Sequence, residues 1–226
     1  MRPIKKLLVT TALDSTWGSH QNIVFLGEWC KKYSMKDSWE SRQYQTLDYH
    51  WKDREKLSKD HIYLESLNED MLMAMTSFLN NFHGIEKTSH YWRIIIGPWL
   101  LAYISVLWDR WEAISLAIKL DAQLETFVLN EALTRPISKD FTGFREALDS
   151  DRWNHGIFAS ILRERAPHTI AVTSLSTKLP LEITLPSLNL TLRQRLLPVF
   201  ARFVDSFFQK FSRKTKKILF FHSYFP

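Results

Sequence analysis

The chain has 226 residues, 45% of them hydrophobic and 24% charged, a composition that allows a buried core and excludes global disorder. Its single cysteine, Cys30, excludes a disulfide within the chain, and the short apolar run near the N-terminus contains two threonines, which makes it a poor signal peptide. The formal net charge is +6, and eight basic residues and one acid lie between positions 193 and 217. The rest of the chain is therefore close to neutral. We therefore expect a cytoplasmic globular protein.

The N-terminal region predicts two strands. Residues 6–11 are apolar and β-branched, and residues 23–26 form a second short apolar run that ends at Gly27. The stretch 29–45 is mixed and predicts partly helical structure. A loop with functional residues is expected after each strand.

Two long helices are predicted next. Residues 53–82 carry apolar side chains at steps of three and four, and residues 90–120 follow Ser89 as a candidate N-cap. Pro98 is expected to kink or split the second helix. The apolar run 94–108 is too short for a typical membrane span, so it predicts a helix buried on all sides in a soluble core, with membrane contact as the alternative.

The remaining elements alternate between strands and helices. We expect strands at 124–129, 169–173 and 217–224, and helices at 141–148, 151–163 and 191–211. Strands separated by helices predict an α/β fold that is rich in helix, with a largely parallel sheet and flanking helices.

The domain organisation predicted from these elements has three parts. Residues 1–173 form an α/β domain with a long helical insertion, residues 174–190 form a loop, and residues 191–226 form a basic helix and a final strand. The basic stretch can contact phosphates, an anionic membrane or an acidic partner, or it can be a solvated helix face. Because the sequence stops directly after a strand, we expect a missing C-terminal half.

Standard cofactor and metal motifs are not present in the sequence. It contains neither a Gly-x-Gly-x-x-Gly nor a phosphate loop, no Cys/His spacing that indicates zinc, and no Gly-x-Ser-x-Gly elbow. No cofactor, no metal and no nucleic-acid partner are therefore predicted.

The first candidate site cluster follows the second predicted strand. Glu28 and Trp29 place a carboxylate beside an aromatic ring, a combination that suits a sugar, since the acid can bind hydroxyls and the ring can pack on C–H groups. The alternative is structural: Glu28 caps the next segment and Trp29 belongs to the core.

The second cluster lies at the start of the first long helix. His50 is a candidate general base because its ordinary pKa suits neutral pH, and Trp51, Asp53 and Arg54 are candidate substrate contacts. Asp53 is also expected at a helix start for electrostatic reasons alone, and a lone histidine is more often structural.

The third cluster centres on Arg93, which is expected to enter the core with its helix. A buried arginine needs a partner, and Asp53 or Glu28 is the predicted one. The alternatives are a structural ion pair or a clamp for a phosphate or a sugar carboxylate.

In order and spacing, these clusters resemble the leptospiral-type surface-carbohydrate transferases, which are associated with surface polysaccharides and nonulosonic acids. The match covers roughly residues 5–117, and Lys52 departs from it by standing where an acid is expected. The segments that carry the resemblance are Leu7 to Thr11 with Thr16-Trp17, Phe25 to Cys30, Tyr49-His50-Trp51 with Asp53-Arg54, Tyr91 to Ile94, Gly97-Pro98-Trp99 and Asp109-Arg110-Trp111.

The resemblance implies one half of a two-domain glycosyltransferase that acts on a sugar or glycan acceptor. Family members are longer, so the nucleotide-sugar donor would bind mostly in the missing half, and peripheral contact with the inner membrane surface is possible for this chain. In such a reaction Glu28 or His50 would deprotonate the acceptor hydroxyl, and Arg93 or Arg54 would hold the leaving phosphate. The alternative is a non-catalytic scaffold that docks an assembly system through the basic C-terminal helix.

Overall fold

The computed structural model describes residues 5–120, 123–130, 138, 140–165 and 170–175. The chain divides into two compact units: residues 1–46 with 120–226, which we call the sheet unit, and residues 47–119, which we call the helical unit. Each is described by itself. Ser174 and Leu175, the first two positions of the loop predicted over 174–190, belong to a strand. The rest of that loop, the predicted helix over 191–211 and the predicted strand over 217–224 lie outside the described residues.

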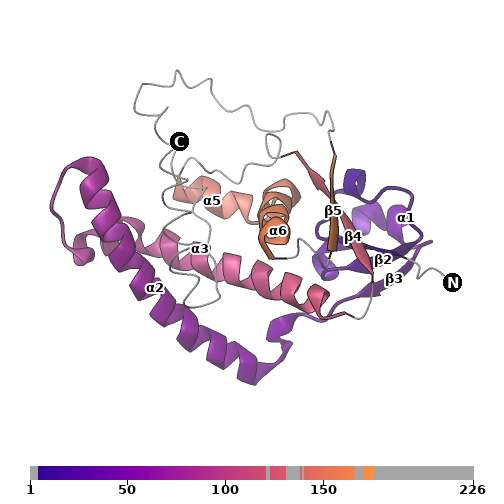
Figure 1. Ribbon diagram of the computed structural model, residues 1–226, viewed down its shortest axis with the longest axis horizontal. Coiled ribbons are helices and arrows are strands. Elements are labelled where there is room, and N and C mark those ends of the chain that lie inside the picture. The colour runs from indigo at the N-terminus through magenta and orange to yellow at the C-terminus, as the bar shows by residue number, and fades with distance from the viewer. Residues whose placement is uncertain (1–4, 121–122, 131–137, 139, 166–169, 176–226) are drawn as a thin grey trace, which may run out of the picture. The chain divides into compact units, whose positions relative to one another are not determined.

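The sheet unit contains five strands, all parallel, in the order β3-β2-β1-β4-β5 (Figure 1). The register places Leu7 opposite Ile23 and Leu124 opposite Ile170. The predicted α/β fold with a parallel sheet is therefore confirmed. The strand bounds are β1 Lys6–Val9, β2 Asn22–Phe25, β3 Gln43–Thr46, β4 Leu124–Leu129 and β5 Ile170–Leu175.

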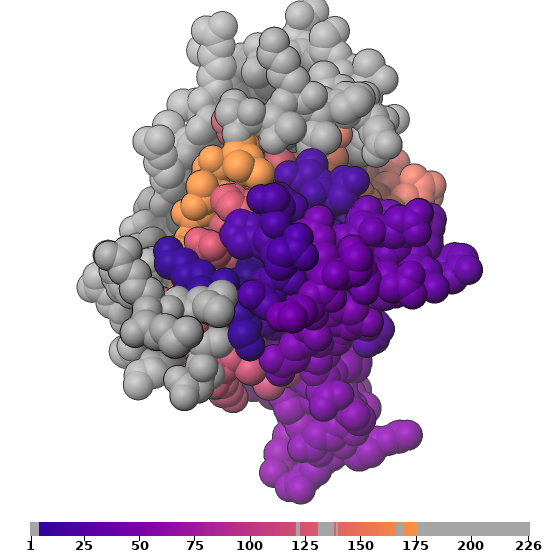
Figure 2. Space-filling view, turned by 90° about the vertical axis from the view of Figure 1, so that its right-hand side faces the viewer, coloured from indigo at the N-terminus to yellow at the C-terminus, as the bar shows by residue number. Residues whose placement is uncertain are grey.

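The burial of each strand explains whether it could be predicted from the sequence. Leu7 and Leu8 on β1 and Val24 on β2 are fully or almost fully buried, as expected of central parallel strands covered on both faces. β3 was missed because it is an edge strand with a polar sequence, Gln-Tyr-Gln-Thr, and three of its four residues are exposed. β5 forms the opposite edge, and part of it is visible in orange in Figure 2.

Short helices connect the strands of the sheet unit. The helix α6 packs against β4 and β5 through an apolar face that includes Ile157, Phe158 and Ile161. It was predicted over 151–163 and ends two residues later. The bounds are η1 Asp14–Thr16, η2 Glu28–Cys30, η3 Tyr33–Met35, α1 Lys36–Trp39, α5 Phe141–Ala147 and α6 Asp151–Arg165.

The helical unit consists of η4 (His50–Lys52), α2 (Arg54–His83) and α3 (Ser89–Ile118), and the two long helices form a hairpin (Figure 1). Much of the outer side of α2 is exposed, and its purple atoms are seen in Figure 2. Both long helices were predicted from their periodicity.

Three details of α3, including its N-cap, differ from the sequence prediction. Pro98 does not split the helix, which runs on as one element because buried residues on both sides of the proline, including Ile96, Trp99 and Leu100, keep it packed. The helix is also not buried on all sides, since Ile94 is 70% exposed. Its N-cap is Thr88, whose side chain accepts from the backbone N–H of Tyr91.

Candidate functional site

The carboxyl edge of the sheet is the first place where chemistry is expected. The chain passes from β1 outward to β2 and β3 and then returns to β4 on the other side of β1, so the strand order reverses between β1 and β4. Ligands of open α/β sheets bind outside the carboxyl ends of the strands at such a point. The residues there are Thr10, Thr11 and Ala12, which are buried.

Internal hydrogen bonds already occupy much of the backbone at this point. The indole N–H of Trp17 donates to the carbonyl of Thr11 at 3.1 Å, and that of Trp29 donates to the carbonyl of Thr10 at 2.9 Å. The N–H of Ala12 donates to Oδ1 of Asp151 at 3.1 Å. The segment after β1 is therefore held by side chains from three other parts of the sheet unit.

Glu28 and Trp29 lie at this edge, directly after β2, as the sequence predicted. The side chain of Glu28 is 77% exposed and forms a 3.0 Å ion pair with Lys31. Trp29 is 36% exposed and its ring stacks on Phe158, with centroids 6.4 Å apart. The carboxylate of Glu28 is thus exposed to solvent and paired with Lys31, whereas Trp29 is partly committed to packing.

Two polar residues at this edge, Asp151 and His155, were missed by the sequence analysis. They lie one turn apart on α6, and Asp151 also bonds the ammonium of Lys32. His155 Nε2 accepts from the N–H of Leu129 at 3.0 Å, which places the ring proton on Nδ1, 3.5 Å from the hydroxyl of Thr11. The available signal was a pair of polar residues at i and i+4 within the apolar face of a predicted helix.

Burial keeps both His155 and Cys30 uncharged near neutral pH. Burial, with a smaller contribution from the charge of Arg163, lowers the pKa of His155 to about 4. Burial raises the pKa of the Cys30 thiol to about 12, and its Sγ donates to the carbonyl of Val9. Neither residue has the reactivity of a base or nucleophile here.

His50 belongs to the helical unit and is the centre of a second buried polar cluster. Its Nε2 donates to Oδ1 of Asp109, on α3, at 2.9 Å. The rings of Tyr49 and Trp51 lie 5.0 and 4.7 Å from the imidazole. The side chain of His50 is 1% exposed, so these neighbours shield it from solvent.

Asp109 is held as a carboxylate. Burial alone would raise its pKa, but the hydrogen bond from His50, the charge of Arg110 and the hydrogen bonds from Tyr49 and Arg110 together lower the pKa below its usual range. Burial and the negative charge of Asp109 raise the pKa of Tyr49. Tyr49 therefore stays a hydroxyl that donates to a fixed anion.

The other ring nitrogen of His50 is unusual. Nδ1 is buried and finds no hydrogen-bond partner within the part of the chain that the structure describes. Because Nε2 carries the proton given to Asp109, Nδ1 of the neutral ring is an acceptor. A buried acceptor without a donor costs about 1–3 kcal/mol, so it calls for an explanation.

Trp51 and its neighbours form a separate network beside His50. The indole N–H of Trp51 donates to Oδ2 of Asp60 at 2.9 Å, and Lys56 bridges Asp60 at 2.6 Å and Glu112 at 2.9 Å. These bonds tie η4 to α2 and α2 to α3. Trp51 was predicted to bind substrate, but its indole N–H is used in this structural hydrogen bond to Asp60.

Asp53 and Arg54 begin α2. Oδ1 of Asp53 accepts from the backbone N–H groups of Glu55 and Lys56 at 2.9 and 3.2 Å, so Asp53 is the helix N-cap. Arg54 is exposed at the first helical position. Both side chains are exposed, but the carboxylate of Asp53 is engaged in capping the helix.

The predicted environment of Arg93 is wrong. Its side chain is exposed and forms two hydrogen bonds of 2.6 and 2.5 Å with Glu69 of α2, so it neither enters the core nor pairs with Asp53 or Glu28. The sixteen positions from Arg93 to Asp109 correspond to about 24 Å along a helix. Arg93 and the His50–Asp109 pair therefore do not share a site.

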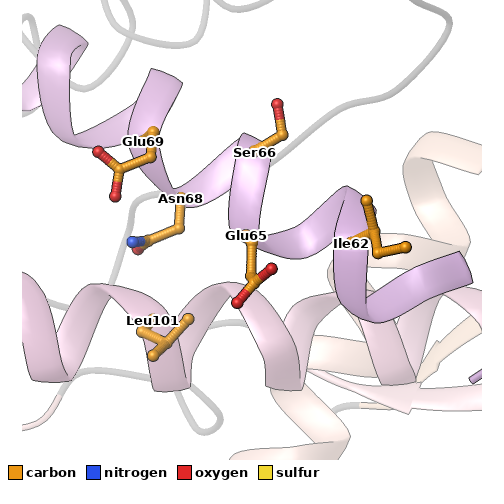
Figure 3. Close-up of a pocket in the computed structure, with 6 residues that line it drawn as sticks. All are labelled: Ile62, Glu65, Ser66, Asn68, Glu69 and Leu101. Atoms are coloured by element: carbon orange, nitrogen blue, oxygen red, sulfur yellow. The ribbon is translucent and has the colours of Figure 1, made fainter. Parts of the chain in front are cut away.

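A shallow open hollow of about 440 Å³ lies beside the Arg93–Glu69 pair, between α2 and α3 (Figure 3). Glu65 and Glu69 face it from α2 and Leu101 from α3. Two carboxylates make it a poor place for a phosphate. Its lining is completed by Ile62, Ser66 and Asn68.

A model of the LIC12162 transferase family matches residues 6–226. The chain belongs to this family. No curated protein and no solved structure shows a significant match. The chain is thus a transferase family member, and the matched region includes both polar clusters.

Group transfer to a hydroxyl needs a base that can reach the hydroxyl proton and an anchor that keeps the base oriented. In this LIC12162 family chain, His50 and Asp109 have the geometry of such a pair, with an unused acceptor on the far side of the ring. Glu28 is the other predicted base and lies in the sheet unit, where its exposed carboxylate pairs with Lys31. Catalytic roles for both residues stay predictions.

Proposed function

We propose that this transferase moves a glycosyl group from a nucleotide sugar to a hydroxyl of a surface-carbohydrate or nonulosonic-acid precursor in the cytoplasm, with His50 as the general base. The single observation that carries the proposal is the 2.9 Å hydrogen bond between His50 Nε2 and Asp109, which leaves Nδ1 as a buried acceptor.

The chemistry follows the logic of a carboxylate-oriented histidine. Nδ1 would accept the proton of the acceptor hydroxyl while the oxygen forms a bond to the anomeric carbon of the donor. The bond from that carbon to the phosphate oxygen breaks, and its electron pair leaves with the nucleotide. The Asp109 carboxylate stabilises the resulting imidazolium without taking its proton.

Access to Nδ1 would be controlled by the neighbouring rings. Tyr49 is 45% exposed and its ring lies 5.0 Å from the imidazole, so it is the side chain that an acceptor would displace. Removing water from such a site strengthens the His50–Asp109 interaction. Arg54, exposed at the start of α2, remains the candidate for the leaving phosphate.

The choice of carbohydrate as the transferred and accepting group rests on two supports. One is the resemblance carried by the aromatic motifs, including Phe25 to Cys30 and Tyr49 to Trp51. The other is the exposed carboxylate of Glu28 beside the partly exposed ring of Trp29 at the carboxyl edge of the sheet. A carboxylate can bind sugar hydroxyls, and a ring can cover their C–H face.

The test uses protein expressed from its complete open reading frame and a panel of nucleotide sugars with glycan acceptors. We expect acceptor-dependent release of nucleotide from one donor, and a product that is the acceptor extended by one residue. His50→Gln should lower this rate by about 10²–10⁴-fold, because a neutral amide cannot take the proton.

Folding is checked separately by circular dichroism and urea denaturation. A His50→Gln protein that folds normally and transfers at the wild-type rate would remove His50 from the mechanism. Release of nucleotide without any product that contains an acceptor would contradict glycosyl transfer itself.

A further inference from the structure

An exposed apolar surface lies at the closed end of the α2–α3 hairpin. We call it the tip surface and define it as Phe82, Tyr91, Ile94, Ile95 and Leu101. Their exposed fractions are 42%, 39%, 70%, 49% and 46%. Positions 91, 94, 95 and 101 share one side of α3, because residues three, four and seven apart fall on the same helical face.

The helix that carries this surface is unusually apolar. Among the described residues, α3 is long and apolar enough by composition to cross a membrane, yet fewer than half of the residues in its most apolar window are buried. Packing against α2 is provided by other residues of α3, including Trp92 and Ile96. Large apolar side chains of α3, including Ile94 and Ile95, are therefore exposed after the hairpin is formed.

The end of the tip surface has the composition of a membrane interface. Ring contacts connect Phe82 to His83, His83 to Trp92 and Trp92 to Tyr91. The ammonium of Lys87 lies 5.5 Å from the centroid of the Tyr91 ring. Aromatic rings with adjacent lysine, placed at one end of an apolar stripe, are typical of the headgroup region of a bilayer.

The charged residues near the tip surface leave the end of the hairpin without a net charge. In the turn after α2, Glu86 and Lys87 balance each other, and Arg93 is neutralised by its two hydrogen bonds to Glu69. Glu65 lines the hollow together with Leu101, and its carboxylate lies 3.6 Å from Nε2 of His61. The hairpin end can thus approach lipid without burying a net charge, whereas the hollow favours water.

We propose that the tip surface docks on the interface of a lipid bilayer, with the turn between α2 and α3 foremost. Ile94 and Ile95 enter the boundary between headgroups and acyl chains, and Tyr91 and Lys87 remain at headgroup level. The docking is peripheral and concerns the helical unit alone. It does not depend on the reaction or on the identity of the base.

The experiment measures binding of the complete protein to vesicles of phosphatidylethanolamine and phosphatidylglycerol by flotation. Ile94→Asn is compared with Ile62→Asn, since Ile62 is also an isoleucine on the surface of the same unit and is 66% exposed. We expect Ile94→Asn to weaken vesicle binding about tenfold, because it removes one buried aliphatic side chain. Ile62→Asn should bind like wild type.

Three results would overturn the proposal. Wild-type protein could fail to float with vesicles, or both variants could bind equally well. Alternatively, analytical ultracentrifugation could show a dimer that only Ile94→Asn dissociates, in which case a second copy covers the surface. Circular dichroism of both variants checks that the hairpin is intact, and no nucleotide sugar is needed, so failure here is distinct from failure of the proposed transfer.

Discussion

The sheet unit and the helical unit each contain a buried histidine, and the two are bonded differently. His155 of the sheet unit accepts from the N–H of Leu129 with one nitrogen and lies near the hydroxyl of Thr11 with the other. His50 of the helical unit donates to the carboxylate of Asp109 and leaves its second nitrogen without a partner in the described part of the chain.

This difference separates a structural histidine from a candidate base. The two groups near the ring nitrogens of His155, the N–H of Leu129 and the hydroxyl of Thr11, are uncharged. Burial lowers the pKa of His155 to about 4, so its ring is neutral. The carboxylate of Asp109 orients the His50 ring by accepting its Nε2 proton, as a general base requires. Burial by itself therefore does not indicate function, and the partners of both nitrogens must be known.

The largest expected effect belongs to Asp109, which anchors His50. Asp109→Asn should lower the transfer rate by about 10²–10⁴-fold, because the amide can neither fix the ring tautomer nor stabilise the imidazolium. The rate is measured as acceptor-dependent nucleotide release.

The chain offers a matched control in Asp60. Asp109 and Asp60 are 5% and 8% exposed and accept from the adjacent residues His50 and Trp51. Asp60→Asn should cost stability and leave the rate per folded molecule unchanged. Equal rate losses in the two variants would make the His50–Asp109 pair structural.

The second prediction concerns His155 and pH. Between pH 6.5 and about 4 the unfolded chain binds a proton that the folded chain does not, so His155 reduces stability as pH falls through this window. The loss is about 3 kcal/mol at most. His155→Gln should therefore be less stable than wild type near neutral pH, and the deficit should shrink toward the acid end.

Urea denaturation at several pH values measures this difference directly. Because all other groups titrate in both proteins, subtracting the two curves isolates His155. A deficit that does not change with pH would show that His155 titrates alike in both states. Transfer by folded His155→Gln should stay near the wild-type rate.

A smaller effect is expected for Glu28 at the carboxyl edge of the sheet. Glu28→Gln should reduce transfer about tenfold, since a sugar hydroxyl loses its hydrogen bond to a charged group. Glu40→Gln is the control, because Glu40 also forms a 3.0 Å surface ion pair with a nearby lysine. If Glu28→Gln loses much more than tenfold of the transfer rate while His50→Gln keeps its activity, Glu28 is identified as the base.

The smallest effect is expected for Arg93. Its guanidinium is exposed and bonded to Glu69, about 24 Å along α3 from Asp109. Arg93→Ala should leave both transfer and the urea midpoint unchanged, since solvent screens exposed ion pairs. Loss of transfer in a folded Arg93→Ala protein would restore the anion clamp predicted from the sequence.

Most of the fold could be predicted from local patterns. The long helices showed three- and four-residue periodicity, and β1 and β2 showed short apolar runs. β3 could not be found because its polar residues lie at an edge, where burial does not constrain them. Glu28 and Trp29 were found because strand ends are visible in the sequence.

The sequence by itself determined the fold class, the strand ends and the presence of His50, Asp109 and Arg93 as polar residues in aromatic motifs. Only the tertiary structure decided that His50 meets Asp109, 59 positions away, and that Arg93 meets Glu69. Local pattern records the preference of each segment for a helix or a strand. The pairing of charged side chains depends on which helix faces come together, and a hydrogen bond forms only when packing brings both groups to about 3 Å.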